Sequence, residues 1–298
     1  MRIAAAYTAV VVLWGTTPLA IKWSGEGPGF LFGVTGRMAI GTLCVLALLP
    51  LTRHNLPMHR KAVLSYLAGA VQIFGAMVAV YWSSQFIPSG WISVVFGLSP
   101  LLTALMAAAW LGERTLGFRR LLAFALGIAG LLQMFGSARE FGGSATAGVT
   151  GVFVSTLLQC GSAVWIKRID AGLPALSQLG GSLVVAMPAY LTTWGLADNH
   201  WPAALSTQNL LAIVYLGVVA TTLGFSLYFF LLRRLTATAL SLISLVSPML
   251  ALLLGHWINH EPLTARILTG TSLVMGALLL HQWDGRVAKG KRLARPRG

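Results

Sequence analysis

Long apolar runs separated by short polar breaks organise the whole chain. Each run is close to the 20 or so residues that an α-helix needs to cross a hydrocarbon core roughly 30 Å thick. A membrane β-barrel would instead show short alternating segments. The pattern predicts an all-α membrane protein with ten transmembrane helices, at 3–23, 29–51, 62–84, 88–111, 117–136, 147–168, 174–196, 208–232, 235–258 and 264–283.

Composition supports this class. The 298 residues are 56% hydrophobic and only 9% charged, with a mean hydropathy of +0.78, whereas a soluble domain carries about 25% charged residues.

The first run is too long for the apolar region of a signal peptide, about 7–15 residues, and no small-x-small cleavage site follows it. Cys44 and Cys160 both fall in predicted helices, which indicates packing residues rather than a disulfide or a metal site. We expect no metal and no cofactor.

The net charge of +14 does not indicate nucleic acid, which would need a soluble basic fold. Six basic residues follow the last predicted helix, where such a cluster is typical of a cytoplasmic anchor to anionic lipid headgroups. They are Arg286, Lys289, Lys291, Arg292, Arg295 and Arg297.

The basic residues also predict the orientation. With the N-terminus inside, all but four of the 21 Lys and Arg fall on the inner side; the exceptions are Lys22, Arg139 and Arg266 outside and Arg37 within a helix. Short cytoplasmic loops collect Lys and Arg. Both termini are therefore predicted to be cytoplasmic, in a multi-pass protein of the inner, or plasma, membrane.

The sequence also repeats itself. Ser99-Pro100 and Glu113 recur as Ser247-Pro248 and Glu261 at one constant offset of 148 residues, and the segment 14–22 aligns with 159–167. Because each half holds five predicted helices, an odd number, the second half must be upside down relative to the first, as in secondary transporters. We expect two five-helix repeats, 1–140 and 141–284 (inverted), and a basic tail, 285–298.

Two strings carry a family resemblance. Leu13-Trp-Gly-Thr-Thr-Pro-Leu-Ala-Ile-Lys22 resembles the first helix of EamA-type members of the drug/metabolite transporter superfamily, and the stretch from Pro100 to Glu113, with its second copy from Pro248 to Glu261, resembles that family's repeated signature. The resemblance implies an exporter of amino acids or related metabolites. It also implies a central cavity lined by helices one, three, four, six, eight and nine, with helices five and ten at the back. The second copy departs from the first in having His260 before its glutamate.

Charged residues near the helices are few, and no Asp or Glu falls inside a predicted helix. Glu113 and Glu261 lie at helix ends, where the first interpretation is stabilisation of the N-terminus of the next helix and the second is a gating salt bridge. Arg37 lies within helix two. It is interpreted as a structural arginine that snorkels to the outer interface, with contact to a substrate carboxylate as the alternative.

Polar and aromatic stripes give the candidate substrate site, because residues three and four apart share a helix face and transporters hold substrate near the midplane. The candidates are Trp14, Thr17, Gln72, Trp82, Ser93, Phe96, Gln159, Ser162, Ser241 and Ser244. Ordinary helix packing is the alternative for each. Pro100 and Pro248 are expected to kink helices four and nine beside the cavity.

Several further side chains have simpler interpretations. Tyr81, Trp82, Trp91 and Trp165 lie near predicted helix ends, which favours interfacial aromatic belts. His256 lies inside helix nine, and a neutral, hydrogen-bonded histidine is the first interpretation there. Gly127, Gly130, Gly270 and Gly276 allow close helix approach, within a monomer or at a homodimer seam.

These features favour a secondary transporter for a small neutral or zwitterionic solute, with weak or indirect ion coupling. The chain has no P-loop string for ATP hydrolysis. A membrane-embedded enzyme is disfavoured because the predicted helices supply no acid and one deep histidine, too little for a catalytic cluster. A scaffold or lipid-scrambling protein that transports no solute is the remaining alternative.

Overall fold

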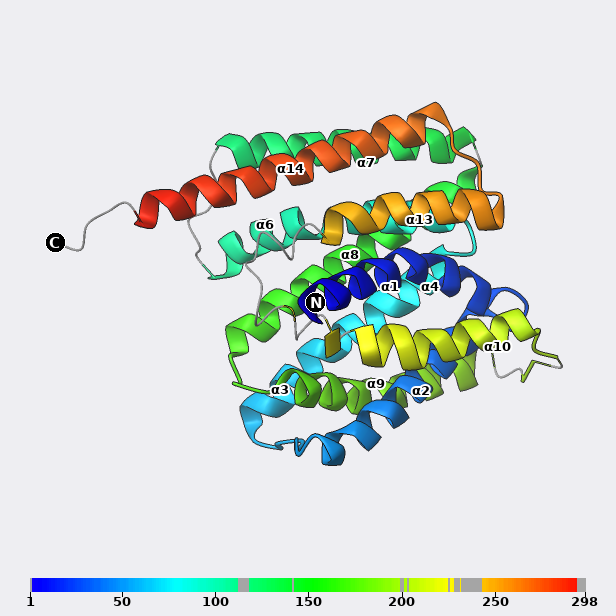
Figure 1. The fold of residues 1–298 in the computed structure, drawn as a ribbon. Helices are drawn as coiled ribbons and strands as arrows, with labels where there is room; N and C mark the ends of the chain where they lie inside the picture. Colours follow the sequence, from blue (N-terminus) through cyan, green and yellow to red (C-terminus); the bar gives the residue numbers. More distant parts are fainter. Residues whose placement is uncertain are drawn as a thin grey trace.

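The computed structural model describes residues 2–111, 118–140, 142–198, 201–202, 204–224, 226–227, 231 and 243–293. Side chains at positions 2, 119–120, 137–140, 244–245 and 282–293 lie outside this description. Within the described residues every regular element is a helix (Figure 1), which confirms the predicted all-α class.

Most helices match the predicted runs to within about four residues, but the last helix continues to Leu293, ten residues past the predicted end at 283 and into the predicted basic tail. The helices are α1 (Arg2–Gly25), α2 (Phe30–Leu51), α3 (Arg60–Ala70), η1 (Val71–Ala76), α4 (Met77–Ser83), α5 (Ser89–Phe96), α6 (Ser99–Leu111), α7 (Phe118–Glu140), α8 (Gly143–Ile169), α9 (Ala175–Ala197), α10 (Thr207–Val214), η2 (Tyr215–Leu223), α13 (Ile243–Asn259) and α14 (Ala265–Leu293). Six continuous helical stretches are long and apolar enough to cross a membrane, and four shorter apolar stretches accompany them among the described residues. The chain is therefore a multi-pass membrane protein, while the count of ten crossings stays a prediction.

The third and the eighth predicted helices share one irregularity. In the third, the π-helical segment η1 separates α3 from α4; in the eighth, the π-helical segment η2 continues α10. The sequence pattern did not predict either segment. A π-helical turn is rare and is frequently found at functional sites, so its presence at matching places in both halves makes these two segments candidates for the functional site.

The fourth predicted helix runs as one stretch from Ser89 to Leu111, but a turn at residues 97–98 divides it into α5 and α6. α5 ends at Phe96 and α6 begins at Ser99, so Pro100 lies in the first turn of a new helix, where a missing N–H costs little. Pro248, its counterpart, lies inside α13.

Helices from the two halves pack against one another throughout the bundle. α1 packs against α13 and α10, and in the same manner α8 packs against α6 and α3. α7 and α14 lie side by side along one edge (Figure 1). There the backbones approach closely, because a Cβ added to Gly130 would come within 2.7 Å of the Gly270 carbonyl oxygen. Gly276, by contrast, has open space beside it.

The α7–α14 pair is antiparallel. Gly130 meets Gly270, and six residues later Gly136 accepts a hydrogen bond from Nη1 of Arg266 at 3.3 Å. The two helices are the fifth of each half, so their opposite directions agree with an inverted repeat.

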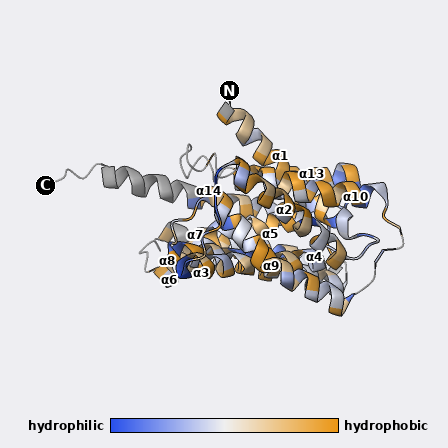
Figure 2. Cartoon of the chain, turned by 90° about the horizontal axis from the view of Figure 1, so that it is seen from below, coloured by the Kyte–Doolittle hydropathy of each residue, from blue (hydrophilic) through white to orange (hydrophobic). Residues whose placement is uncertain are grey.

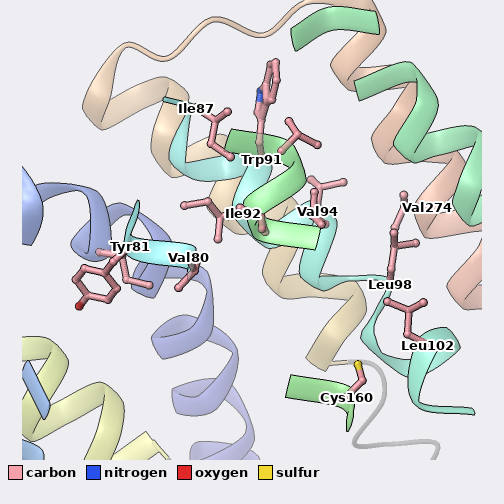
Figure 3. Packing of buried hydrophobic residues seen from close by; sticks show 14 of the residues in the cluster. Val80, Tyr81, Ile87, Trp91, Ile92, Val94, Leu98, Leu102, Cys160 and Val274 are labelled. Carbon is pink, nitrogen blue, oxygen red and sulfur yellow. The ribbon is translucent and has the colours of Figure 1, made fainter. Parts of the chain in front are cut away.

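Apolar residues cover much of the length of most helices (Figure 2). Many large ones are exposed on the outside of the bundle, Leu43, Leu132 and Trp257 among them, as lipid-facing residues would be. The interior is also apolar, and the short helix α5 contributes the fully buried Trp91, Ile92 and Val94 (Figure 3). Tyr81 and Trp91 are both fully buried, so the prediction that they belong to interfacial belts is wrong. Trp82 and Trp165 are exposed, as belt residues would be.

Candidate functional site

One end of the bundle is held together by Glu261, in the loop between α13 and α14. Its carboxylate is 6% exposed and accepts hydrogen bonds from the backbone N–H of Ser89 at 2.9 Å and of Gly90 at 3.3 Å. The Ser89 hydroxyl donates a third bond at 3.0 Å. Glu261 therefore caps α5, a helix of the other half, whose N-cap residue, Pro88, has no side-chain cap of its own.

Two further groups fix this carboxylate. Lys22, at the end of α1, forms an ion pair with it at 3.7 Å, and Nδ2 of Asn259 donates to it at 3.0 Å. The Trp23 indole N–H in turn donates to Oδ1 of Asn259 at 3.2 Å. We call Lys22, Ser89, Gly90, Asn259 and Glu261 the Glu261 lock.

Glu261 has two interpretations from the sequence, stabilisation of the next helix and a gating salt bridge. The structure shows a helix-capping contact and a salt bridge at Glu261, with one correction to the first interpretation. The glutamate does stabilise a helix N-terminus, but that helix is α5 and not the following helix, α14. The sequence could not show this, because Ser89 and Glu261 are 172 positions apart. Glu113, the repeat counterpart, lies outside the described residues.

Arg37 is the second charged feature, and it lies inside the bundle. Its side chain is 5% exposed, and its Nε donates to the Thr221 hydroxyl of η2 at 3.2 Å. Tyr190 and Tyr215 are close enough to interact electrostatically with the guanidinium. The interpretation of Arg37 as a side chain that snorkels to the interface is therefore wrong, because a snorkelling side chain would be exposed.

The tyrosines connect Arg37 to both π-helical segments. Tyr190, on α9, donates its hydroxyl to the Ile73 carbonyl oxygen of η1 and packs edge-on against Phe74. Tyr215 is the first residue of η2 and shares a hydrogen bond of 2.5 Å with Thr16 of α1. Arg37, Tyr190, Tyr215 and Thr221 form what we call the Arg37 cluster. Only Arg37 of these was a candidate from the sequence.

The stripe on α8 is engaged in helix packing. The Ser162 hydroxyl donates to the Ala68 carbonyl oxygen at 2.7 Å, and Ser155 donates to that of Ala76 at 2.6 Å. Gln159, between them, is half-buried, as is Gln72 on the neighbouring η1. The two serines thus bridge α8 to the third predicted helix. Substrate contact by Gln72 and Gln159 stays a prediction.

The remaining candidates lie on α1, α4 and α5. Trp14 is half-buried, and the Thr17 hydroxyl donates to the Leu13 carbonyl oxygen of its own helix at 2.6 Å. Ser93 is buried, Phe96 packs against the main core, and Trp82 is 38% exposed. Their substrate contacts stay predictions. Ser241 lies outside the described residues, as does the side chain of Ser244.

His256 is hydrogen-bonded, as its first interpretation expects, but it is not buried inside the bundle. Its Nδ1 lies 2.9 Å from the Glu261 carbonyl oxygen, yet much of the residue is exposed. It thus steadies the loop that carries the lock. Among the described residues, no group of three His, Cys, Asp or Glu is placed to hold a metal ion.

Comparison with known proteins settles the family. The model of the EamA-like transporter family matches residues 2–136 and again residues 146–281. The chain belongs to the EamA-like transporter family. The double match spans most of both halves, and EamA-like proteins named as transporters align over nearly the whole chain.

Three such relatives illustrate the sequence identity and the share of each chain that aligns. The uncharacterized transporter YvbV of Bacillus subtilis is 24% identical over 94% of this chain and 91% of its own. The uncharacterized inner membrane transporter YedA of Escherichia coli is 26% identical over 86% and 82%. A probable terminal-alkyne amino-acid exporter of Streptantibioticus cattleyicolor is 22% identical over 93% and 92%. A solved crystal structure aligns over 94% of this chain and 97% of its own with a TM-score of 0.65 at 21% identity, which shows a shared fold.

Proposed function

We propose that this EamA-like protein carries small organic solutes across the inner membrane by alternating access, exporting amino acids or related metabolites. The Glu261 lock is the observation that carries the proposal. It joins α1 and α5 of one half to the α13–α14 loop of the other, so it closes one end of the bundle with a few polar bonds that can break and reform.

The packing pattern supports an exchange between two such states. Because α1 meets α13 and α10 as α8 meets α6 and α3, the first helix of each half makes equivalent contacts with the other half. Inverted halves of this kind can rock about a central site and open one end at a time. With the orientation predicted from the charges, the Glu261 lock closes the outer face.

A transport assay tests the proposal. Purified protein is reconstituted in sealed vesicles, loaded with each amino acid in turn, and counterflow of the same labelled amino acid is measured. We expect counterflow above that of protein-free vesicles for at least one neutral amino acid. Absence of counterflow across a panel extended to other small metabolites would refute a carrier.

The gate has its own test in Glu261→Gln, which removes the charge and keeps one acceptor oxygen. We expect the end of the bundle that carries the Glu261 lock to open more often in this variant. A cysteine placed at Ser93, in a background without Cys44 and Cys160, reports on the opening. It should react at least about threefold faster with a membrane-impermeant thiol reagent applied from that side. Glu26→Gln is the matched control, because Glu26 is an exposed acid at the same end. Equal labelling in the two variants would exclude Glu261 as a gate.

A further inference from the structure

Arg37 places an incompletely bonded cation inside the bundle. The side chain is 5% exposed, and its Nη1 has no hydrogen-bond partner among the described residues. The Nε bond to Thr221 is made to a neutral hydroxyl. A guanidinium has five N–H donors in a fixed fork, so this arrangement leaves bonding capacity that the described residues do not use.

The charge also has no counter-charge in the part of the chain that the structure describes. Among the described residues no carboxylate forms an ion pair with Arg37, since the ion pair found there joins Lys22 to Glu261. The whole sequence contains seven acidic residues, and all of them fall outside the predicted helices. An isolated buried charge is costly, by about 2.5–3.5 kcal/mol even on insertion scales, and such residues ordinarily mark a ligand or ion pathway.

A second unused donor belongs to α4, a helix that packs against α2, the helix of Arg37. The Tyr81 hydroxyl is buried without a hydrogen-bond partner among the described residues, and it points away from the Trp91 and Ile92 side chains (Figure 3). The helices that carry Arg37, Tyr81 and Tyr190 pack together, since α2 contacts both α4 and α9, and Tyr190 interacts electrostatically with both other side chains. A buried hydroxyl that stays unpaired costs about 1–3 kcal/mol, and an acceptor brought by a ligand would remove that cost.

The backbone around this pair of donors is irregular on both sides. Tyr190 is bonded to the carbonyl oxygen of Ile73 in η1, and Thr221 lies in η2. Arg37 is thus bonded directly to η2 of the second half, while Tyr190, which interacts electrostatically with Arg37, is bonded to η1 of the first half. A ligand group bound there would contact both halves and would sense their relative movement.

We propose that Arg37, with Tyr81, binds the carboxylate group of the transported solute. A carboxylate supplies the missing negative charge, and its two oxygens match the guanidinium fork. The inference rests on the proposed function and narrows it to solutes that carry a carboxylate, either anionic or zwitterionic. Solutes that carry no carboxylate are excluded, whether they are uncharged or cationic.

Binding, measured apart from transport, tests the assignment. The purified protein in detergent is titrated with amino acids and with short mono- and dicarboxylates, and each is compared with its carboxamide by thermal shift and calorimetry. We expect at least one carboxylate to bind and its amide to bind at least about tenfold more weakly. If no carboxylate binds, or if each amide binds as well as its acid, the assignment is wrong.

Substitutions locate the binding group. Arg37→Gln should weaken the binding of the carboxylate at least about tenfold and leave the weak binding of its amide unchanged, while Arg37→Lys, which keeps the charge, should retain part of the affinity. Tyr81→Phe keeps the ring and removes the hydroxyl, so a loss of carboxylate affinity of about three- to tenfold is expected from it.

If Arg37→Gln fails to fold, the carboxylate affinities of Tyr81→Phe and Arg37→Lys still decide. Unchanged affinity in both variants would overturn the proposal. Stabilisation by chloride alone that Arg37→Gln abolishes would identify a halide site instead and would also overturn it.

This test separates two failures. Carboxylate binding that depends on Arg37, together with no flux in vesicles, would leave the site standing and refute the carrier. Flux of amides as fast as that of their acids would leave the carrier standing and refute the site.

Discussion

At the residue scale, Glu261 shows how one distant side chain can cap a helix that has no local side-chain cap. α5 begins after a proline that offers no side-chain cap, and a carboxylate 172 positions away bonds two of its first N–H groups. The sequence predicted that Glu261 would stabilise a helix start, because acids are favourable there. The identity of the helix depends on tertiary packing, which no local pattern encodes.

Gly255 makes room for this carboxylate. A Cβ at this position would approach Oε2 of Glu261 more closely than van der Waals contact allows. We therefore expect Gly255→Ala to displace the carboxylate and to destabilise the protein by about 1–3 kcal/mol, the cost of leaving buried polar groups unpaired. A lower midpoint of thermal unfolding in detergent would show it.

Gly276→Ala is the control, because a Cβ there meets nothing within 4 Å and alanine favours a helix over glycine. Its unfolding midpoint should be unchanged or higher. Equal midpoints for the two alanine variants would mean that Gly255 does not hold the Glu261 lock in place.

At the scale of the element, the hydrophobic pattern predicted where helices lie but not how each is built. The ends of α1, α2 and α9 lie within two residues of the predicted ends, because polar residues, glycine and proline mark the boundaries of the apolar runs. The segments η1 and η2 and the turn before Ser99 were missed, since helix-breaking and π-helical turns depend on which carbonyls neighbouring helices bond.

The candidate site was predicted unevenly for the same reason. Arg37 was found because a charge in an apolar run is conspicuous, whereas Tyr190, Tyr215 and Thr221 resemble ordinary residues of an apolar helix. Ser162 and Ser155 share the face expected of them, yet their hydroxyls bond backbone carbonyls of the third predicted helix. A polar stripe alone does not distinguish a cavity from a helix contact.

The α7–α14 contact gives a prediction at this scale. Because the backbones of Gly130 and Gly270 touch, Gly130→Leu should push the helices apart and reduce the stability and the yield of folded protein. Size-exclusion chromatography and thermal unfolding would measure the loss. Normal yield and an unchanged unfolding midpoint would show that the contact is dispensable.

For the whole molecule, the antiparallel α7–α14 pair predicts opposite faces for two segments. Gly136 and Arg266 lie together, so the C-terminal end of α14 lies at the far end of the pair. Cysteines placed at Gly143 and Val287, in a background without Cys44 and Cys160, should therefore label from opposite sides of the membrane, with Val287 reached from the cytoplasm. Labelling of both from one side would refute the inverted repeat and the orientation together.

The glycine contact between α7 and α14 also bears on how the molecule would move. Because the two backbones touch there, with Val274, Gln133 and Met134 packed around the contact, we expect this edge to separate least when the two halves rock. Such a hinge keeps its shape while the opposite edge widens and narrows, so the residues that select a solute and the residues that set the axis of motion can change independently during evolution.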